Sequence, residues 1–512
     1  MSSEISVDRG NSIDRISENI YGHFAEHLGR CIYGGIWVGE DEDRVETEDG
    51  IRTDTVELLE DLEIPVLRWP GGCFADDYHW EDGVGPRDER PRRRNLWWSQ
   101  GREDVFEESN EFGTDEFLHL TELLDTEAYL AVNVGSSTPQ EALDWIEYCN
   151  FDGDTELTRR RAENGHPEPY DVKYWGIGNE NWGCGGRYAP DEYGDQYRRF
   201  ANYLRGFNSW LNPGDTEFIA CGHITEGWND EFFETLEGAM EFGPGTFLGM
   251  GSPYELMDHF SVHRYYQAGG DADFTDDQHY RIFARAQKIG GDIDRAAEVI
   301  DEYTPEGFDI GIIVDEWGVW HPEAVPDNGL EQENTVRDAL TTAGVFDLFH
   351  ERADVVSMAN IAQTVNVLQC MVQTDEDDAW ATPTYHVFDL YSRHKGNVAL
   401  ETAVDTETKR YDEEDHSVEM VSASASEGDD EVVVTASNRH LDHTETVQID
   451  VGEELSVADA TLLFDDLESA DYSTKDNADE FEPAEADVSD QGDGTFLVEL
   501  PPTSVVGVTF AE

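Results

Sequence analysis

The chain has 512 residues, of which 38% are apolar and 11% are aromatic. This length allows a large core and about two domains, and the aromatic content argues against a disordered chain. Acidic residues number 114 and basic residues 33, which gives a formal net charge of −81. Because no basic patch is available to meet phosphates, nucleic acid is excluded as an expected partner.

The acidic residues extend along the whole chain, from 40–43 to 479–487, and Lys occurs only five times. Such a charge opposes the compact state at low ionic strength, whereas at about 1 M salt the Debye length falls to about 3 Å and the repulsion is screened. A partner with a basic surface would instead predict charge concentrated in one face or tail. The sequence therefore predicts a halophile's protein that works in salt-loaded cytoplasm.

Localisation is expected to be cytoplasmic. The first eight residues contain neither a basic nor an apolar region, so we expect no signal peptide. No apolar run reaches the roughly 18 residues that a membrane span needs, and no membrane partner is expected. Scattered cysteines without a CxxC pair favour reduced thiols in an intracellular protein; they are Cys31, Cys73, Cys149, Cys184, Cys221 and Cys370.

In chain order, short apolar runs that are typical of buried strands alternate with stretches of helical spacing. The runs are Ile20–Phe24, Ile64–Arg68, Ala128–Val134, Val172–Gly178, Glu217–Cys221, His259–His263, Ile310–Asp315 and Val355–Ile361. The helical stretches include Thr53–Leu62, Phe117–Leu124, Pro139–Tyr148, Asp191–Leu211, Tyr280–Ile300 and Glu333–His350. This alternation predicts a (β/α)8 TIM barrel over residues 18–390.

After about residue 390 the pattern changes to short β-branched runs that turn or acidic segments separate. They are Val418–Ala425, Glu431–Ser437, Thr444–Val451, Ala460–Phe464, Phe496–Leu500 and Val505–Phe510. We expect a C-terminal antiparallel β-sandwich, jelly-roll-like, over residues 391–512, joined by residues 1–17. The acidic stretch Glu468–Gly492 is expected to be a loop. The predicted fold class is therefore α/β plus all-β.

Polar residues stand at or just after the C-terminal ends of the predicted barrel strands, the face on which such barrels carry their active sites. They are Glu26, Arg68, Asn133, Glu180, His223, His263, Glu316 and Gln363.

Glu180 and Glu316 both follow apolar runs, and a carboxylate there is costly unless it is paired or placed in a site. Retaining glycoside hydrolysis needs two carboxyls about 5–5.5 Å apart, one as acid/base and one as nucleophile. Asn179 is placed to bond a sugar 2-OH, and Trp317 and Trp320 to wall the site. The alternative is that both glutamates are ordinary surface charges.

Several motifs together resemble the family 51 glycoside hydrolases, specifically the intracellular α-L-arabinofuranosidases. They are residues 20–30 (IYGHFAEHLGR), 67–74 (LRWPGGCF), 80–86 (WEDGVGP), 110–113 (NEFG), 178–180 (GNE), 263–266 (HRYY), 315–317 (DEW) and 359–363 (ANIAQ). The resemblance covers nearly the whole chain. It implies a retaining, exo-acting enzyme that releases terminal arabinofuranosyl residues from oligosaccharides derived from arabinan or arabinoxylan.

The resemblance also implies individual roles. Glu180 would be the acid/base and Glu316 the nucleophile, with Arg68 and His263 as supporting residues. Residues implied to line the site for the arabinofuranosyl ring are Glu26, Cys73, Asn179, Tyr265 and Gln363. A homo-oligomer, a hexamer or smaller, is implied as well. The segment Ser99–Ser109 is longer than is usual in the family, which leaves the aglycone-side contacts near Trp97 and Trp98 open.

Other interpretations remain. The family also contains β-xylosidases and endoglucanases, although the contexts of Glu26 and Gln363 favour an arabinofuranoside. A non-catalytic carbohydrate-binding protein would leave the two glutamates without a use. His23-x-x-Glu26-His27 matches an inverted zinc-peptidase motif, which requires a helix. Cys73 is expected to pack against the sugar, although a lone Cys can also be a metal ligand or a nucleophile. No metal or cofactor is expected.

Overall fold

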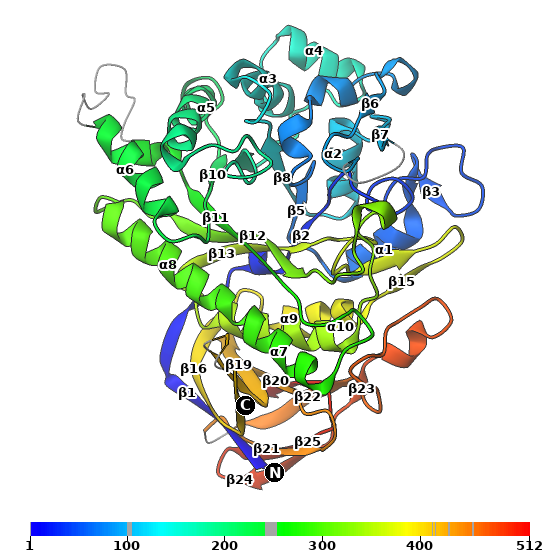
Figure 1. Ribbon diagram of the computed structural model, residues 1–512, viewed down its shortest axis with the longest axis vertical. Coiled ribbons are helices and arrows are strands. Elements are labelled where there is room, and N and C mark those ends of the chain that lie inside the picture. Colours follow the sequence, from blue (N-terminus) through cyan, green and yellow to red (C-terminus); the bar gives the residue numbers. More distant parts are fainter. Residues whose placement is uncertain are drawn as a thin grey trace.

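The computed structural model describes residues 2–99, 105–240, 253–411, 413–414, 416–428, 431–452 and 455–511. Figure 1 shows a barrel with its helices in the upper part of the view and a β-sandwich in the lower part, where both chain termini lie. Among the helices of these residues, none is long and apolar enough to cross a membrane.

Parallel strands close into a barrel in the order β10-β11-β12-β13-β2-β5-β8-β9. Their bounds are β2 Gly22–Phe24, β5 Val66–Trp69, β8 Glu127–Val132, β9 Tyr174–Ile177, β10 Glu217–Cys221, β11 His259–Tyr266, β12 Gly311–Val319 and β13 Val356–Ala362. Each of them overlaps one predicted strand, and the predicted TIM barrel is confirmed. Side chains fill the barrel as such a fold requires; Val66, Tyr129, Tyr174, Ile219, Ile313 and Met358 form one buried cluster.

Helices surround the barrel, and most of the predicted ones are present. They are α1 Thr53–Asp61, α2 Thr114–Leu123, α3 Pro139–Asn150, α4 Glu156–Glu163, α5 Pro190–Trp210, α6 Trp228–Met240, α7 Asp276–Ala286, α8 Lys288–Tyr303, α9 Val336–His350 and α10 Pro383–Tyr391. The single helix expected over 280–300 is two helices, which meet at Gln287. Helices α4, α6 and α10 were not predicted.

The C-terminal strands form an antiparallel structure that continues into the N-terminus. The sheet order is β23-β22-β26-β20-β19-β16-β1-β21-β25-β24. The bounds are β16 Val398–Asp405, β19 Val421–Gly428, β20 Glu431–Asn438, β21 Glu445–Asp450, β22 Ser456–Leu463, β23 Ala484–Glu485, β24 Val488–Gly492, β25 Thr495–Leu500 and β26 Ser504–Ala511. The expected C-terminal all-β part is confirmed.

The N-terminal strand β1, Ser2–Arg15, ties the two ends of the chain together. It pairs antiparallel with β16 and parallel with β21, so it lies inside the sheet. It is much longer than the expected segment Ile5–Val7.

The expectation of a loop over 468–492 was wrong in part, because β24 pairs with β25 there. Four of the five β24 residues are exposed, as an edge strand allows, and this hides the alternation that usually marks a strand.

Helices α9 and α10 separate the barrel from the sandwich in Figure 1. The His350 ring at the end of α9 bonds both parts, to the Tyr21 hydroxyl at 2.9 Å and to the Ser424 hydroxyl of β19 at 2.8 Å. Tyr391 of α10 donates to the buried carboxylate of Asp347 at 3.1 Å. This buried polar contact anchors α10 to α9.

Candidate active site

Four barrel strands bring the two glutamates and their neighbours to one end of the barrel. Glu180 follows β9 by three residues, Glu316 lies in β12, and His263 and Tyr265 lie in β11. The pairing of β11 with β12 shifts register after Val262, which sets His263 beside Glu316. Arg68 comes from β5. The C-terminal strand ends thus carry the site, as they do in other barrels of this kind.

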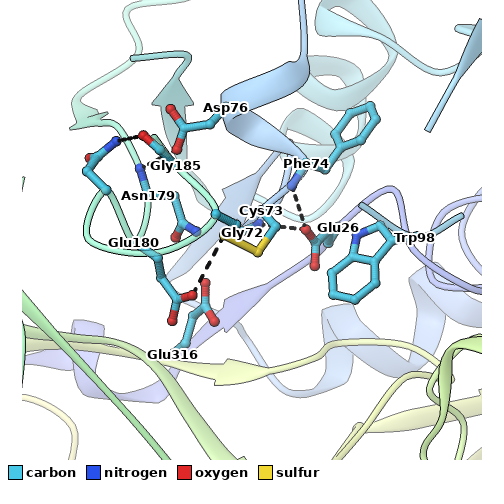
Figure 2. The surroundings of a disulfide bond; sticks show 12 residues. Glu26, Gly72, Cys73, Phe74, Asp76, Trp98, Asn179, Glu180, Gly185 and Glu316 are labelled. Carbon is cyan, nitrogen blue, oxygen red and sulfur yellow. Dashed lines mark hydrogen bonds between the residues drawn. A yellow bond between two sulfur atoms is a disulfide. The ribbon is translucent and has the colours of Figure 1, made fainter. Parts of the chain in front are cut away.

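The carboxylates of Glu180 and Glu316 face each other, as Figure 2 shows. One oxygen of each, together with a ring nitrogen of His263, lies within 4.8 Å of the others. The Glu180 side chain is 19% exposed and that of Glu316 only 7%. Glu180 is therefore the carboxylate with the more open side.

Glu316 is held as an anion by its contacts. Arg68 Nη1 donates to its Oε1 at 3.0 Å, and the Tyr265 hydroxyl donates to its Oε2 at 2.8 Å. Burial by itself would raise the pKa of Glu316, but the charges of His263 and Arg68 and these hydrogen bonds outweigh it and hold the pKa below its ordinary value. An ionised carboxylate suits a nucleophile.

His263 stands between the two carboxylates. Its Nδ1 lies 3.1 Å from Glu180 Oε1 and 3.6 Å from Glu316 Oε2. Burial would lower the pKa of His263, yet the charge of Glu316 and the hydrogen bond and charge of Glu180 raise it above its ordinary value. The imidazole is therefore placed to hold a proton between two acidic groups.

Arg68 is buried and surrounded by acceptors. Its Nε lies 3.4 Å from Asp315 Oδ1, and its Nη2 donates to Asn179 Oδ1 at 2.5 Å. Asp315 accepts further hydrogen bonds from the Tyr129 hydroxyl and from Asn360 Nδ2. A buried cation is tolerated where carboxylates and amides satisfy it in this way.

The loop that carries Glu180 is held in place by hydrogen bonds to the buried carboxylate of Asp76. Asp76 Oδ2 accepts from the Asn179 backbone N–H at 2.9 Å, and its Oδ1 accepts from the N–H groups of Val134 and Gly135. Burial raises the pKa of Asp76 to about 7 against these three hydrogen bonds. Gly178 has φ +88° and Glu180 φ +41°, so the chain turns sharply just before the carboxylate.

A disulfide joins Cys73 to Cys184 beside the acid pair, and Figure 2 shows it next to Glu180. Cys184 Sγ lies 3.8 Å from Glu180 Oε2. The expectation of reduced thiols was wrong for these two residues, and the interpretation of Cys73 as an unpaired Cys was wrong as well. The barrel brings them together across 111 residues of sequence. The other four cysteines are buried free thiols.

Glu26 and Gln363 form a second polar group on the same face. Glu26 Oε1 accepts from the backbone N–H groups of Gly72 and Phe74 at 3.0 Å each, and Gln363 Nε2 donates to Glu26 Oε2 at 3.1 Å. Burial, with the charge of Glu316, raises the pKa of Glu26 to about 7. Trp98 lies beside Glu26 in Figure 2. The predicted segment Ser99–Ser109 falls partly outside the described residues.

Among the buried polar atoms at this face that have no hydrogen-bond partner in the described residues are a donor, Asn179 Nδ2, and an acceptor, Gln363 Oε1. A donor and an acceptor left in this state fit hydroxyl groups of a bound ligand. Gly72 gives room for such a ligand, because a Cβ at this position would stand 2.7 Å from Glu316 Oε1. Trp320 packs edge-on against Tyr265, with ring centroids 5.3 Å apart.

Some strand-end residues have other tasks. Asn133 Nδ2 donates to the Tyr78 carbonyl and to the Ser136 hydroxyl, and Asn133 Oδ1 accepts from the Ser136 backbone N–H. His223 packs against the Trp182 ring, 4.1 Å away. Trp317 lies fully buried among aromatic rings of α9 and α10. It therefore belongs to the core and does not wall the site.

The metallopeptidase interpretation was wrong. His23 lies in strand β2 and His27 in the loop that follows, where a zinc motif would need a helix. Both ring nitrogens of His27 are used within the core, with Trp69 Nε1 donating to Nε2 at 3.0 Å and Glu108 2.8 Å from Nδ1.

Sequence reasoning missed Asp76, Asp315, Tyr129 and Cys184 as parts of the site. Cys184 stands in Gly-Cys-Gly four residues after Glu180, which was the signal that could have found it. No sequence signal marks Asp76 or Tyr129, because Asp76 accepts from backbone N–H groups and Tyr129 donates to the neighbouring Asp315 carboxylate.

Two family models match the chain. Residues 58–280 match the Alpha-L-arabinofuranosidase 1 domain, and residues 315–504 match the Alpha-L-arabinofuranosidase C-terminal domain. Both glutamates lie within these ranges, Glu180 in the first and Glu316 in the second.

Relatives match over nearly the whole chain. An intracellular exo-alpha-L-arabinofuranosidase of Bacteroides ovatus is 36% identical, over 98% of this chain and 94% of that protein. Alpha-L-arabinofuranosidase C of Emericella nidulans is 38% identical, over 73% of this chain and 71% of that protein. The crystal structure of the GH51 arabinofuranosidase of Xanthomonas axonopodis pv. citri superposes with a TM-score of 0.89 at 33% identity, over 99% of both chains. The crystal structure of the Thermotoga maritima alpha-L-arabinofuranosidase in complex with arabinose superposes with a TM-score of 0.81 at 31% identity, over 100% of both chains.

These matches define a barrel glycoside hydrolase. The chain belongs to the GH51 α-L-arabinofuranosidase family.

Proposed function

We propose that this protein is a retaining, exo-acting α-L-arabinofuranosidase that removes terminal α-L-arabinofuranosyl residues from the non-reducing ends of oligosaccharides. In the first step Glu180 donates its proton to the glycosidic oxygen, the C1–O bond breaks, and Glu316 bonds C1. In the second step Glu180 takes a proton from water, the water oxygen bonds C1, and Glu316 leaves as a carboxylate. Two inversions at C1 give net retention.

The separation of the two carboxylates carries this proposal. Oxygens within 4.8 Å of one another fit the spacing of about 5–5.5 Å in retaining enzymes, whereas inverting enzymes need about 6.5–9.5 Å to admit a water. The lowered pKa of Glu316 supports the nucleophile at this position, and the greater exposure of Glu180 supports the partner that meets the leaving group and water.

Sugar recognition is proposed for the residues around this pair. Asn179 Nδ2 is placed to bond the 2-OH, a contact that strengthens in the transition state. Glu26 and Gln363 form a hydrogen-bonded pair that would bind further hydroxyls, with Tyr265 and Trp320 as an aromatic wall. Arg68 and His263 position the carboxylates. Cys73 contributes through its disulfide.

The cellular setting is proposed from composition and from the relatives. The net charge of −81 and the presence of only five Lys support a protein that works in the salt-loaded cytoplasm of a halophile. The Bacteroides ovatus relative is named intracellular. Oligosaccharides taken up from arabinan or arabinoxylan would then be the substrates. Detection of the enzyme mainly outside intact cells would contradict this setting.

Two structural assignments are also proposals. Residues 18–390 are proposed as the catalytic domain and 391–512, with 1–17, as the sandwich domain. A homo-oligomer, a hexamer or smaller, is supported by the exposed Tyr203, Trp210 and Leu211 around the end of α5. Light scattering at high salt measures the state directly, and a monomer at micromolar concentration would contradict it.

Azide rescue tests the two roles. Hydrolysis of 4-nitrophenyl α-L-arabinofuranoside is measured at high salt for the wild type, Glu180→Ala and Glu316→Ala, with the exposed Glu255→Ala as control. We expect turnover in the wild type and control and loss in both other variants. Azide then restores product formation with retained configuration in Glu180→Ala and inverted configuration in Glu316→Ala. Activity on a xyloside or glucan alone would replace the proposed sugar, and no glycosidase activity would overturn the proposal.

A further inference from the structure

The loop between β20 and β21, residues 439–444, and the first residue of β21 bring two imidazoles and a carboxylate together. His440, His443 and Glu445 each offer one ligand atom, and these atoms lie within 4.8 Å of one another. The two imidazole rings are 3.6 Å apart between centroids, and His443 Nε2 lies 3.9 Å from Glu445 Oε2. Their spacing, His-x-x-His-x-Glu, needs only one tight turn to bring the three side chains together.

The ring nitrogens of the pair are left available. His440 is 4% exposed, and its Nε2 is buried without a hydrogen-bond partner among the described residues. The same holds for His443 Nε2. A buried imidazole nitrogen without a partner calls for an explanation such as an ion. Asp442 Oδ1 lies 3.0 Å from His443 Nδ1. This fixes the tautomer that presents Nε2 as a lone pair, the arrangement usual behind metal-bound histidines.

The surrounding chain holds this geometry in place. The His440 backbone N–H donates to Asn438 Oδ1, and its carbonyl accepts from the Thr503 N–H at 3.0 Å. Asn438 Nδ2 donates to the His443 carbonyl at 3.2 Å. Glu445 Oε1 accepts from the Ser3 hydroxyl at 2.7 Å. The carboxylate is therefore oriented by strand β1, and the two histidines by the β20–β21 loop.

We propose that His440, His443 and Glu445 bind one divalent transition-metal ion of the zinc class, which ties the β20–β21 loop to the start of β21, where Glu445 also bonds Ser3 of β1. Two imidazoles and one carboxylate are the donors that zinc uses, at about 2.0–2.2 Å from the metal. Contraction of the three ligand atoms toward a common centre requires small side-chain rotations. His443 is partly exposed, which gives the ion a path from solvent and leaves a position for water.

Binding of the metal would affect the stability of the β-sandwich. The metal would strengthen the junction at which β1 pairs in parallel with β21, from Ser2 opposite Thr446 to Ser6 opposite Asp450. We expect slower hydrogen exchange at the β1 amides in the presence of zinc. The unfolding midpoint should rise by about 2 °C at a metal concentration near 100 times Kd. Turnover at the barrel should not depend on this site.

The test is equilibrium dialysis of the whole protein against ZnCl2 in about 1 M KCl, which suppresses weak binding to surface carboxylates. The variants are His440→Gln, His443→Gln and Asp442→Asn. His416→Gln is the matched control, because His416 is partly exposed on β18 (His416–Glu419) and lies outside the β20–β21 loop. Glu180→Gln controls for binding between the active-site carboxylates. CoCl2 gives a visible absorption band as a second readout of imidazole ligation.

We expect one Zn²⁺ per chain in the wild type and in both controls. Affinity should fall by about 10–100-fold in Asp442→Asn, and by more in His440→Gln and His443→Gln. Circular dichroism of the metal-free variants checks that they fold, and His443→Gln is the most secure because its side chain is partly exposed. No tight Zn²⁺ in folded wild type would overturn the proposal. So would Zn²⁺ that survives His443→Gln and is lost in Glu180→Gln.

Discussion

Removal of one hydroxyl, in Tyr265→Phe, isolates the contribution of a single hydrogen bond to the anionic state of Glu316. The Tyr265 hydroxyl donates to Glu316 Oε2 at 2.8 Å, and the ring packs on Trp320. Phe keeps that packing and removes the donor. A hydrogen bond to a charged group contributes about 1.5–3 kcal/mol. At about 1.4 kcal/mol per tenfold, its loss should lower kcat/KM by about 10–150-fold, and it should raise the pKa of Glu316 because the anion loses a donor.

The assay is the pH dependence of kcat/KM on 4-nitrophenyl α-L-arabinofuranoside. Because the pKa of Glu316 lies below its ordinary value in the wild type, the acidic limb should move to higher pH in Tyr265→Phe. Tyr266→Phe is the matched control, since the Tyr266 hydroxyl is buried without a hydrogen-bond partner among the described residues. An unmoved acidic limb with less than about a threefold loss would refute the reasoning.

Other perturbations probe the supports of the site. Asp76→Asn sets an amide N–H against the Asn179 N–H, and a buried donor left without an acceptor costs about 1–3 kcal/mol. We therefore expect kcat/KM to fall about 10–100-fold. Unchanged kinetics would count against a positioning role for Asp76. Replacement of both Cys73 and Cys184 by Ser opens a loop of 111 residues and should cost about 4–5 kcal/mol of unfolding free energy in denaturant melts; equal melts would contradict it. Glu26 has a folded-state pKa of about 7, raised by burial, so its neutral form stabilises the fold fully below about pH 4.5 and this stability is lost as pH rises through 7. Glu26→Gln should therefore reduce the loss of stability between pH 5 and 8 by up to about 3 kcal/mol, and parallel pH curves would disprove this.

The barrel could be predicted because its strands are buried on both faces, so each one is a continuous apolar run with a polar residue at its end. Helix α10 escaped prediction for a related reason: nearly all its side chains are buried, so no polar face marks a helical period. Helix α4 escaped prediction for the opposite reason: only two of its residues are buried, so the segment is polar and has no apolar face.

The reactive pair could be predicted, whereas its supports could not. Glu180 and Glu316 stand in apolar contexts that make a carboxylate conspicuous. Asp76 follows Phe74-Ala75 in a short turn and resembles any other acidic residue of this chain until its three backbone hydrogen bonds are seen. The Cys73–Cys184 bond depends on two distant loops meeting above the barrel, and no local pattern encodes that meeting.

The stereochemistry of the first-formed product tests the central claim most directly. Proton NMR of the wild-type enzyme acting on 4-nitrophenyl α-L-arabinofuranoside reports the anomeric configuration of arabinose before mutarotation. Because carboxylate oxygens of Glu180 and Glu316 lie within 4.8 Å of each other, we expect the α-anomer to appear first. Initial release of the β-anomer would contradict double displacement through Glu316.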